Sequence, residues 1–340
     1  MTGRHESVGV NVENLTKTYY PSPAWMKFLV RSNIKQEVVA LDGISFSVKP
    51  GEICAVVGPN GAGKTTTFRI LVGLTTSTSG HASIMGYDCN TESVAIRRVV
   101  GWMPAEDRSL IMRLSCAENL RFHGRLQGLK GEELNKRVHE TLHKVGIGHA
   151  AESSVFALSA GMKARLQLAR ALLSDPRVLI LDEPTGSVDP VASHELLNLI
   201  ISIVEEQGIA ALISSHRLEE IEALHSHAIL LDKGRIRYDG DLDSLRGQLD
   251  RPTLELEFVS DHTAASAAAE LDVSGLGEVV LQEANLLQLV LSPDTSVGTV
   301  LDRLAPRLAE IVHVRELQTP LRDLLAQMYA RGEARKEEES

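Results

Sequence analysis

The stretch Gly58-Pro59-Asn60-Gly61-Ala62-Gly63-Lys64-Thr65-Thr66 decides the fold. It fits the phosphate-binding loop pattern G-x-x-x-x-G-K-[ST] at every defined position. An apolar run at 53–57 precedes it, and 64–74 follows with helical spacing. In such a unit, backbone N–H groups and the positive end of the helix cradle phosphate oxygens. All nine residues are therefore candidate nucleotide ligands, with Lys64 directed at the β- and γ-phosphates and Thr65 at Mg²⁺.

Two adjacent carboxylates follow a second apolar run. Asp182 and Glu183 end the segment Val178-Leu179-Ile180-Leu181-Asp182-Glu183. A buried strand here would aim Asp182 at a metal ion, usually through water. Glu183 would point toward the γ-phosphate and polarise the attacking water as general base. An apolar run that ends in Asp-Glu is weak evidence alone, but it is strong evidence when a phosphate loop lies upstream.

The hydrophobic pattern predicts an α/β fold for the first part of the chain. Apolar and alternating runs predict strands that are separated by segments with helical spacing, which is typical of a mostly parallel sheet covered on both faces. The expected strands are 8–15, 38–48, 53–57, 99–103, 178–181, 209–214 and 228–232, and the expected helices are 64–74, 118–126, 132–145, 192–207 and 217–224.

The character of the sequence changes after Gly240. The order becomes strand-helix-strand-strand-helix-strand, which predicts a small α+β ferredoxin-like accessory domain. The expected segments are 253–259, 263–271, 277–282, 286–291, 297–311 and 312–317, with a further helix at 321–329. We therefore expect a nucleotide-binding domain at 1–247, with a helical subdomain at about 106–175, an accessory domain at 248–330 and a charged tail at 331–340.

Composition excludes several classes of protein. The chain has 340 residues, of which 43% are hydrophobic and 24% charged, as in an ordinary globular protein. Its net charge is −10 and it has no Lys/Arg run longer than two, so no nucleic-acid partner is expected. Cys54, Cys89 and Cys116 lack metal-ligand spacing, which favours reduced thiols. There is no signal-peptide pattern, and the longest apolar run, 196–204, is shorter than the about 20 residues that a bilayer requires.

Together the motifs resemble the ATP-binding-cassette (ABC) family, a P-loop NTPase family with a mixed sheet core and a helical subdomain, over about 8–247. Leu158-Ser159-Ala160-Gly161-Met162 is similar to the family's signature loop, whose commonest form is Leu-Ser-Gly-Gly-Gln. Ala160 and Met162 are departures, whereas Ser159 and Gly161 match. In the family this loop contacts ATP bound to the opposite subunit. The resemblance therefore implies a second cassette, paired head to tail, with a homodimer as the simplest arrangement.

Further residues match the family one by one. His216, in Ile-Ser-Ser-His, matches the switch histidine that senses the γ-phosphate and would act with Glu183 and Lys64 in catalysis. Asp189 matches the aspartate of the subunit-crossing loop. Tyr19 matches the aromatic residue that stacks on adenine, with Tyr20 as the alternative.

One expected residue is missing. The family usually has a Gln after the strand expected at 99–103, where it contacts Mg²⁺ and couples to the membrane domain. Alignment from Gly101 places Ala105 there, whereas alignment backward from Leu114-Ser115 places Glu106 there. Glu106 is our candidate metal ligand beside Thr65 and Asp182. The alternative is a loop that has lost direct contact with the metal.

The resemblance implies an ATPase, with ATP and Mg²⁺ as cofactors, that powers separate membrane-spanning permease chains from the cytoplasmic face of the membrane. Residues 317–325, the altered signature and the insert at 21–37 resemble ABC-2-type exporter subunits, which move drugs, lipids or polysaccharides. The insert, with Trp25 and Phe28 beside Lys27, is either a surface flap or an amphipathic turn that touches lipid or the permease. The alternative function is a soluble ABC ATPase that acts on ribosomes or DNA.

Overall fold

A computed structural model describes residues 8–21, 36–105, 109–224, 227–242, 244, 253–292 and 295–317. The chain divides into two compact units, Met1–Leu242 and Asp243–Ser340, against an expected boundary after residue 247. Glu106, most of the insert at 21–37, the expected helix at 321–329 and the tail at 331–340 lie outside the described residues.

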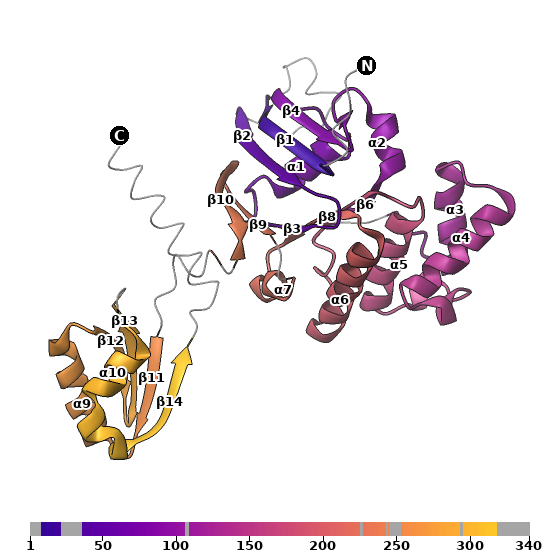
Figure 1. Cartoon of the computed structure of the whole chain (residues 1–340). Helices are drawn as coiled ribbons and strands as arrows, with labels where there is room; N and C mark the ends of the chain where they lie inside the picture. The colour runs from indigo at the N-terminus through magenta and orange to yellow at the C-terminus, as the bar shows by residue number, and fades with distance from the viewer. Residues whose placement is uncertain are drawn as a thin grey trace. The chain divides into compact units, whose positions relative to one another are not determined.

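A six-stranded sheet forms the centre of the first unit, in the order β10-β9-β3-β8-β7-β6 (Figure 1). The neighbours from β9 to β6 pair in parallel, and β10 pairs antiparallel with β9. Every residue of β3, β7 and β8 is buried, as expected for parallel strands covered on both faces. The strands are β3 (Ile53–Val57), β6 (Val100–Met103), β7 (Val178–Asp182), β8 (Ala210–Ser215), β9 (His227–Asp232) and β10 (Arg235–Asp241).

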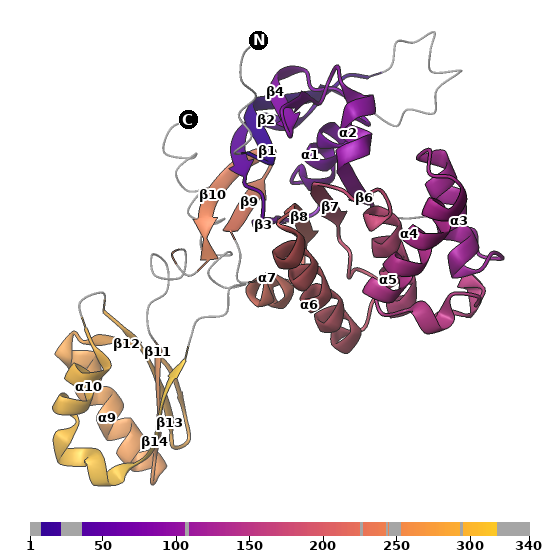
Figure 2. The same cartoon turned by 45° about the vertical axis from the view of Figure 1, so that its right-hand side comes forward.

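A second, antiparallel sheet has the order β2-β1-β4-β5. Helix α1 (Lys64–Leu71) lies between the two sheets, as Figures 1 and 2 both show. Its Phe68 and Ile70 are fully buried in one cluster with Val12 of the second sheet and Val56 of the first. This shared core fixes the phosphate loop, because the loop joins β3 to α1. The strands of the second sheet are β1 (Val10–Tyr19), β2 (Val38–Val48), β4 (Ser79–Ile84) and β5 (Tyr87–Asp88).

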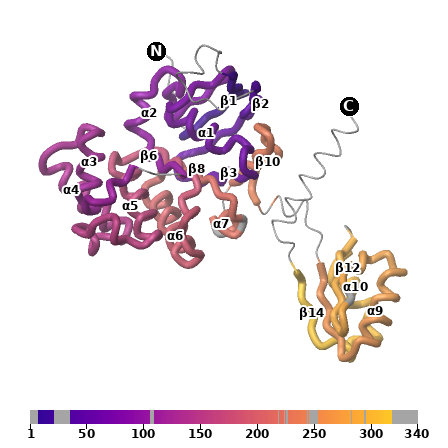
Figure 3. Tube along the Cα trace, turned by 180° about the vertical axis from the view of Figure 1, so that it is seen from behind, coloured from indigo at the N-terminus to yellow at the C-terminus, as the bar shows by residue number. Residues whose placement is uncertain are grey.

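Helices cover the opposite face of the central sheet and extend beyond its β6 edge. Figure 3 shows α3 and α4 on the side of the unit away from β10. Ser115 and Glu118 form a capping box that begins α3. These helices are α3 (Cys116–Leu126), α4 (Gly131–Lys144), α5 (Ala160–Leu172), α6 (Pro190–Gln207) and α7 (Leu218–Ala223). Helix α2 (Ser93–Val99) instead packs on the α1 side, where its Ile96 is buried in the shared core.

Several predicted boundaries were wrong. The helix expected at 64–74 ends at Leu71, because Gly73 has a left-handed φ of 69°. The helix expected at 297–311 is α10 (Val297–Arg303) followed by a 3-10 helix, Ala305–Glu310. Pro306 lies in this second segment, where it lacks the N–H that an α-helix would need. Helix α6 begins at Pro190 rather than at Ala192, with Asp189 as its N-cap.

The second unit has the predicted ferredoxin-like order. Its antiparallel sheet runs β12-β13-β11-β14, and Figure 2 shows α9 and α10 on one face. Leu256 and Phe258 of the sheet and Ala264 and Val300 of the helices form its core, fully buried. Together with the first unit, this confirms the predicted fold class. The remaining elements are β11 (Thr253–Phe258), α9 (Asp261–Ser274), β12 (Gly277–Glu283), β13 (Leu286–Leu291) and β14 (Ile311–Leu317).

Candidate active site

Residues 58–63 connect β3 to α1, and Lys64, Thr65 and Thr66 begin the helix, as the sequence predicted. Two of its glycines are required by geometry. A Cβ at Gly58 would lie 2.2 Å from the carbonyl oxygen of Leu231 on the neighbouring strand β9. Gly63 is the N-cap of α1 and has a φ of 114°, which L side chains rarely adopt. These glycines let the backbone turn tightly into the helix.

Lys64 is folded back over this loop. Its ammonium donates to the carbonyl oxygen of Gly58 at 2.6 Å and to that of Pro59 at 3.3 Å. The residue is only 5% exposed. Burial lowers the pKa of Lys64, although the charges of Glu183 and Asp182 oppose that shift. The ammonium is thus held at the mouth of the loop beside two carboxylates.

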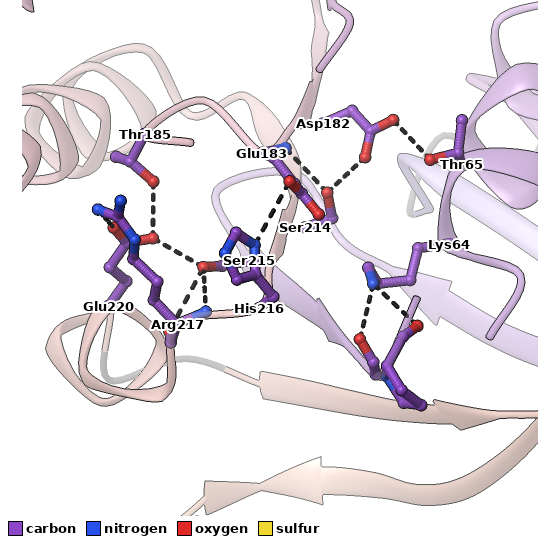
Figure 4. Close-up of polar contacts among 12 residues, drawn as sticks. Lys64, Thr65, Asp182, Glu183, Thr185, Ser214, Ser215, His216, Arg217 and Glu220 are labelled. Atoms are coloured by element: carbon purple, nitrogen blue, oxygen red, sulfur yellow. Dashed lines mark hydrogen bonds and ion pairs between the residues drawn. The ribbon is translucent and has the colours of Figure 1, made fainter. Parts of the chain in front are cut away.

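Thr65 and Asp182 meet across the site (Figure 4). The Thr65 hydroxyl donates to Asp182 Oδ2 at 2.9 Å, and the Ser214 hydroxyl donates to Oδ1 at 2.6 Å. Asp182 ends β7 and Ser214 lies on the neighbouring strand β8, so the sheet sets their spacing. Ser214 also accepts the backbone N–H of Glu183 at 2.9 Å. One serine therefore orients both carboxylate residues.

Glu183 and His216 form a second pair. Glu183 Oε2 lies 3.4 Å from His216 Nδ1, and the two side chains are 26% and 50% exposed. Glu183 has a φ of 49°, a left-handed conformation that costs on the order of 1–3 kcal/mol in a non-glycine residue. The backbone N–H bonds to Ser214 help to hold this conformation. This left-handed conformation places the Glu183 side chain beside His216, just beyond the end of β7.

A cavity of about 370 Å³ lies next to Glu183. Ala105, which one of the two alignments places at the position of the missing Gln, lines this cavity together with Lys163 and Gln167 of α5. The sequence argument missed these two α5 residues, although both follow the signature loop within two helical turns. Glu106, which the other alignment places at that position, lies outside the described residues. Its role as a metal ligand therefore stays a prediction.

The signature loop and the subunit-crossing loop both begin helices. Ser159 accepts the N–H of Met162 at 3.2 Å as N-cap of α5, and Asp189 accepts the N–H of Ala192 at 3.0 Å as N-cap of α6. A Cβ at Gly161 would lie 3.1 Å from Ala192 Cβ, so the two helix starts are neighbours. Ser159 and Asp189 are exposed. Among the described residues, no hydrogen bond or ion pair joins Ser159 to Lys64.

Tyr19 is the last residue of β1, where it pairs with Val38. The Lys17 ammonium lies 5.0 Å from the centroid of its ring. Tyr20, the alternative, is 61% exposed. Tyr19 is therefore the less exposed of the two tyrosines, and the candidate adenine contact stays a prediction.

Comparison with known proteins identifies the family of the chain. The family model for ABC transporters matches residues 41–186. The doxorubicin resistance ATP-binding protein DrrA of Mycobacterium tuberculosis (strain CDC 1551 / Oshkosh) is 37% identical over 72% of this chain and 69% of its own length. The linearmycin resistance ATP-binding protein LnrL of Bacillus subtilis (strain 168) is 33% identical over 76% of this chain and 83% of its own. The chain belongs to the ABC transporter family.

The solved structures agree with this assignment. A dimeric ATP-binding cassette, MJ0796, in a post-hydrolysis state bound to ADP and Pi, superposes with a TM-score of 0.58 at 26% identity. The match covers 68% of this chain and 98% of that one. This ABC subunit is therefore a nucleotide-binding ATPase, which confirms the prediction from the phosphate loop. No helix within the described residues combines the length and the apolar character needed to cross a membrane.

Proposed function

We propose that this ABC subunit hydrolyses Mg·ATP in a pair of cassettes and thereby drives a separate permease that exports a drug-like, lipid or polysaccharide substrate. The observation that carries the proposal is the convergence of Lys64, Thr65, Asp182, Glu183 and His216 at one edge of the central sheet. These residue types can bind phosphates, hold a divalent ion and activate water.

The donor set suits Mg²⁺. This ion prefers oxygen ligands in octahedral geometry at about 2.0–2.1 Å, so neighbouring ligand oxygens lie about 3 Å apart. Thr65 Oγ1 and Asp182 Oδ2 are 2.9 Å apart and both are oxygens. Thr65 and Asp182 would hold the ion, Asp182 directly or through water, and Glu106 is a further candidate. Bound there, Mg²⁺ would neutralise charge on the phosphates.

In this proposal the side chains of the site have separate roles in hydrolysis. Lys64 donates hydrogen bonds to the β- and γ-phosphates in place of its present bonds to Gly58 and Pro59. Glu183 accepts a proton from the attacking water, and His216, 3.4 Å away, contacts the γ-phosphate. Because phosphoryl transfer depends mainly on positioning and charge, the orienting contacts from Ser214 contribute directly to the rate.

A second cassette completes the site in this proposal. Ser159 and Gly161 mark the start of α5, a thirteen-residue helix whose positive end favours a phosphate. Asp189 marks the exposed start of α6 beside it. The dimeric state of the MJ0796 cassette supports a pair of cassettes. We place the two head to tail, with a second copy of this chain as the simplest partner. Closure on ATP and opening after hydrolysis would drive the permease.

The relatives support export as the direction of transport. Two of them are named for resistance to doxorubicin and to linearmycin. A third, BcrA of Bacillus licheniformis, is named for bacitracin transport and is 37% identical over 66% of this chain and 72% of its own. None of these three is named for ribosomes or DNA, so the soluble alternative gains no support from them. The subunit would then lie at the cytoplasmic face of the membrane, bound to its permease.

Purification from native membranes in mild detergent tests the proposal. The wild-type subunit should co-elute with a polytopic membrane protein in a constant ratio. The Glu183→Gln variant serves as a matched bait that should retain ATP, and Lys64→Ala as one that should not. A subunit that remains in the soluble fraction without a membrane protein in all three preparations would contradict the assignment to a transporter.

A further inference from the structure

A buried carboxylate contacts the two chain segments that carry the catalytic pair. Glu220, on α7, is only 8% exposed. Its Oε2 accepts the Thr185 hydroxyl at 2.6 Å and the Ser215 hydroxyl at 2.7 Å. Arg217 Nη1 lies 3.3 Å from the other oxygen, Oε1. Figure 4 shows this carboxylate between the two hydroxyls, apart from Asp182 and Lys64.

Each partner of Glu220 is next to a residue of the proposed site. Ser215 precedes His216, and Thr185 follows Glu183 after one proline. A single oxygen atom therefore connects the two chain segments that carry the catalytic pair. Because peptide units are planar and of fixed length, a shift of the hydroxyl residues would be passed to the neighbouring side chains.

Arg217 extends the network toward the subunit-crossing loop. Its Nη1 also donates to the carbonyl oxygen of Val188 at 3.3 Å and to the Ser193 hydroxyl at 3.4 Å. Val188 precedes Asp189, the exposed N-cap of α6. The backbone N–H of Arg217 in turn donates to the Ser215 hydroxyl at 3.0 Å. The loop that the proposal places at the second cassette is thus bonded to the segment that contains His216.

The chemistry of the network argues against simple packing. Removing a carboxylate from water is costly unless its oxygens are bonded, and hydrogen bonds to a charged acceptor are stronger than neutral ones. An apolar residue at 220 would fill the space without that cost, but it would leave the Thr185 and Ser215 hydroxyls without this acceptor. The charge therefore fixes the direction of two particular hydroxyls.

We infer that Glu220 is a positioning residue that holds His216 and Glu183 in register and ties both to the loop that carries Asp189. It acts through the Thr185 and Ser215 hydroxyls. It acts by keeping the Nδ1–Oε2 separation of the catalytic pair near 3.4 Å, at a site where misplacement by about 1 Å can reduce the rate about a hundredfold. The inference rests on the proposed roles of Glu183 and His216.

Kinetics of the full chain test it. Glu220→Gln should lower kcat roughly ten- to a hundredfold, the effect of losing a charged hydrogen bond, while KM for ATP changes less than about twofold. Thr185→Val and Ser215→Ala each remove one hydroxyl and should show the same split in smaller degree. Glu219→Gln removes an exposed carboxylate from the same helix, and it should leave both constants unchanged.

A double mutant separates positioning from general destabilisation. In a His216→Ala background, Glu220→Gln should lower kcat by a clearly smaller factor than in the wild type, because one of the two residues that it positions is already gone. Multiplicative losses in that background, or wild-type kcat in all three network variants, would overturn the inference. Near-normal turnover by Glu183→Gln would instead remove the proposed catalytic role itself, so the two failures are distinguishable.

Discussion

The Nδ1 atom of His216 lies 3.4 Å from Glu183 Oε2, although the two residues come from different strands of the central sheet. Each follows the end of a parallel strand, β7 for Glu183 and β8 for His216. Parallel neighbours end at the same edge, so the pair is brought together by the sheet and by the left-handed turn at Glu183. The pairing allows one group to bind the γ-phosphate while the other accepts a proton from water.

Replacement of Glu183 by Gln should separate binding from hydrolysis. The amide keeps the size of the side chain but cannot act as a base, and loss of a general base costs about 10²- to 10⁴-fold in rate. We expect ATP affinity to be retained and the ATP-bound dimer to accumulate, which size-exclusion chromatography with and without ATP would measure. Near-normal phosphate release by this variant would rule out Glu183 as the base.

Replacement of Lys64 by Ala should instead abolish nucleotide binding. The ammonium is the buried cation of the loop, and a charge-assisted hydrogen bond to phosphate accounts for at least roughly a tenfold change in affinity. Binding of a fluorescent ATP analogue measures the change. Lys49→Ala, at an exposed lysine of the same unit, is the matched control and should bind normally. The melting temperature should be recorded too, since the Gly58 carbonyl loses its donor.

Local pattern was enough to predict the elements that hold the site. The phosphate loop, the Asp182–Glu183 pair and the strand before His216 lie at the ends of fully buried apolar runs, β3, β7 and β8. Such runs are distinctive because burial on both faces removes polar residues. Half-exposed strands were predicted only where apolar residues alternate, as in β2 and β11, and the other half-exposed strands gave no such signal. Strand β10, with the sequence RIRYDGD, and strand β4, SGHASI, were not predicted for that reason.

The supporting contacts of the site could not be predicted. Helix α7 contains Glu219, Glu220 and Glu222, and the sequence alone does not distinguish them. Only the fold shows that Glu220 is buried against Thr185 and Ser215, while Glu219 is exposed. The role of Ser214 could not be predicted either, because its contact with Asp182 depends on the register between β7 and β8. Proximity across strands is a property of the tertiary structure.

Two adjacent tyrosines offer a test of the adenine contact. Tyr19→Ala should raise the Kd for ATP roughly five- to a hundredfold, since stacking of a base on an aromatic ring contributes about 1–3 kcal/mol. Tyr19→Phe keeps the ring and should bind normally, and Tyr20→Ala should have little effect. Isothermal titration calorimetry gives all three values. The reverse result, with Tyr20→Ala impaired and Tyr19→Ala normal, would transfer the role to Tyr20.

A half-buried histidine away from the active site, His227, should make stability depend on pH. His227 Nδ1 lies 2.9 Å from Glu52 Oε1, and its Nε2 contacts Asp239 Oδ1. Burial opposes protonation, but the hydrogen bonds to Asp239 and Glu52 outweigh it and raise the pKa of His227. Cys54, its partner in register on β3, stays a neutral thiol because burial raises its pKa well above the usual value.

The sign of the effect follows from the raised folded-state pKa. Protonation of His227 favours the folded chain. Its contribution to the free energy of unfolding is therefore complete below about pH 6.5, the ordinary pKa of histidine, and it is lost as the pH rises through the folded-state pKa. His227→Gln should therefore reduce the free energy of unfolding more at about pH 6 than at about pH 8. Urea titration followed by tryptophan fluorescence measures it, since Trp102 lies on β6 of the first unit. His194→Gln, at an exposed histidine of that unit, is the control. A loss for His227→Gln that is equal at both pH values would show that protonation of His227 does not stabilise the folded chain.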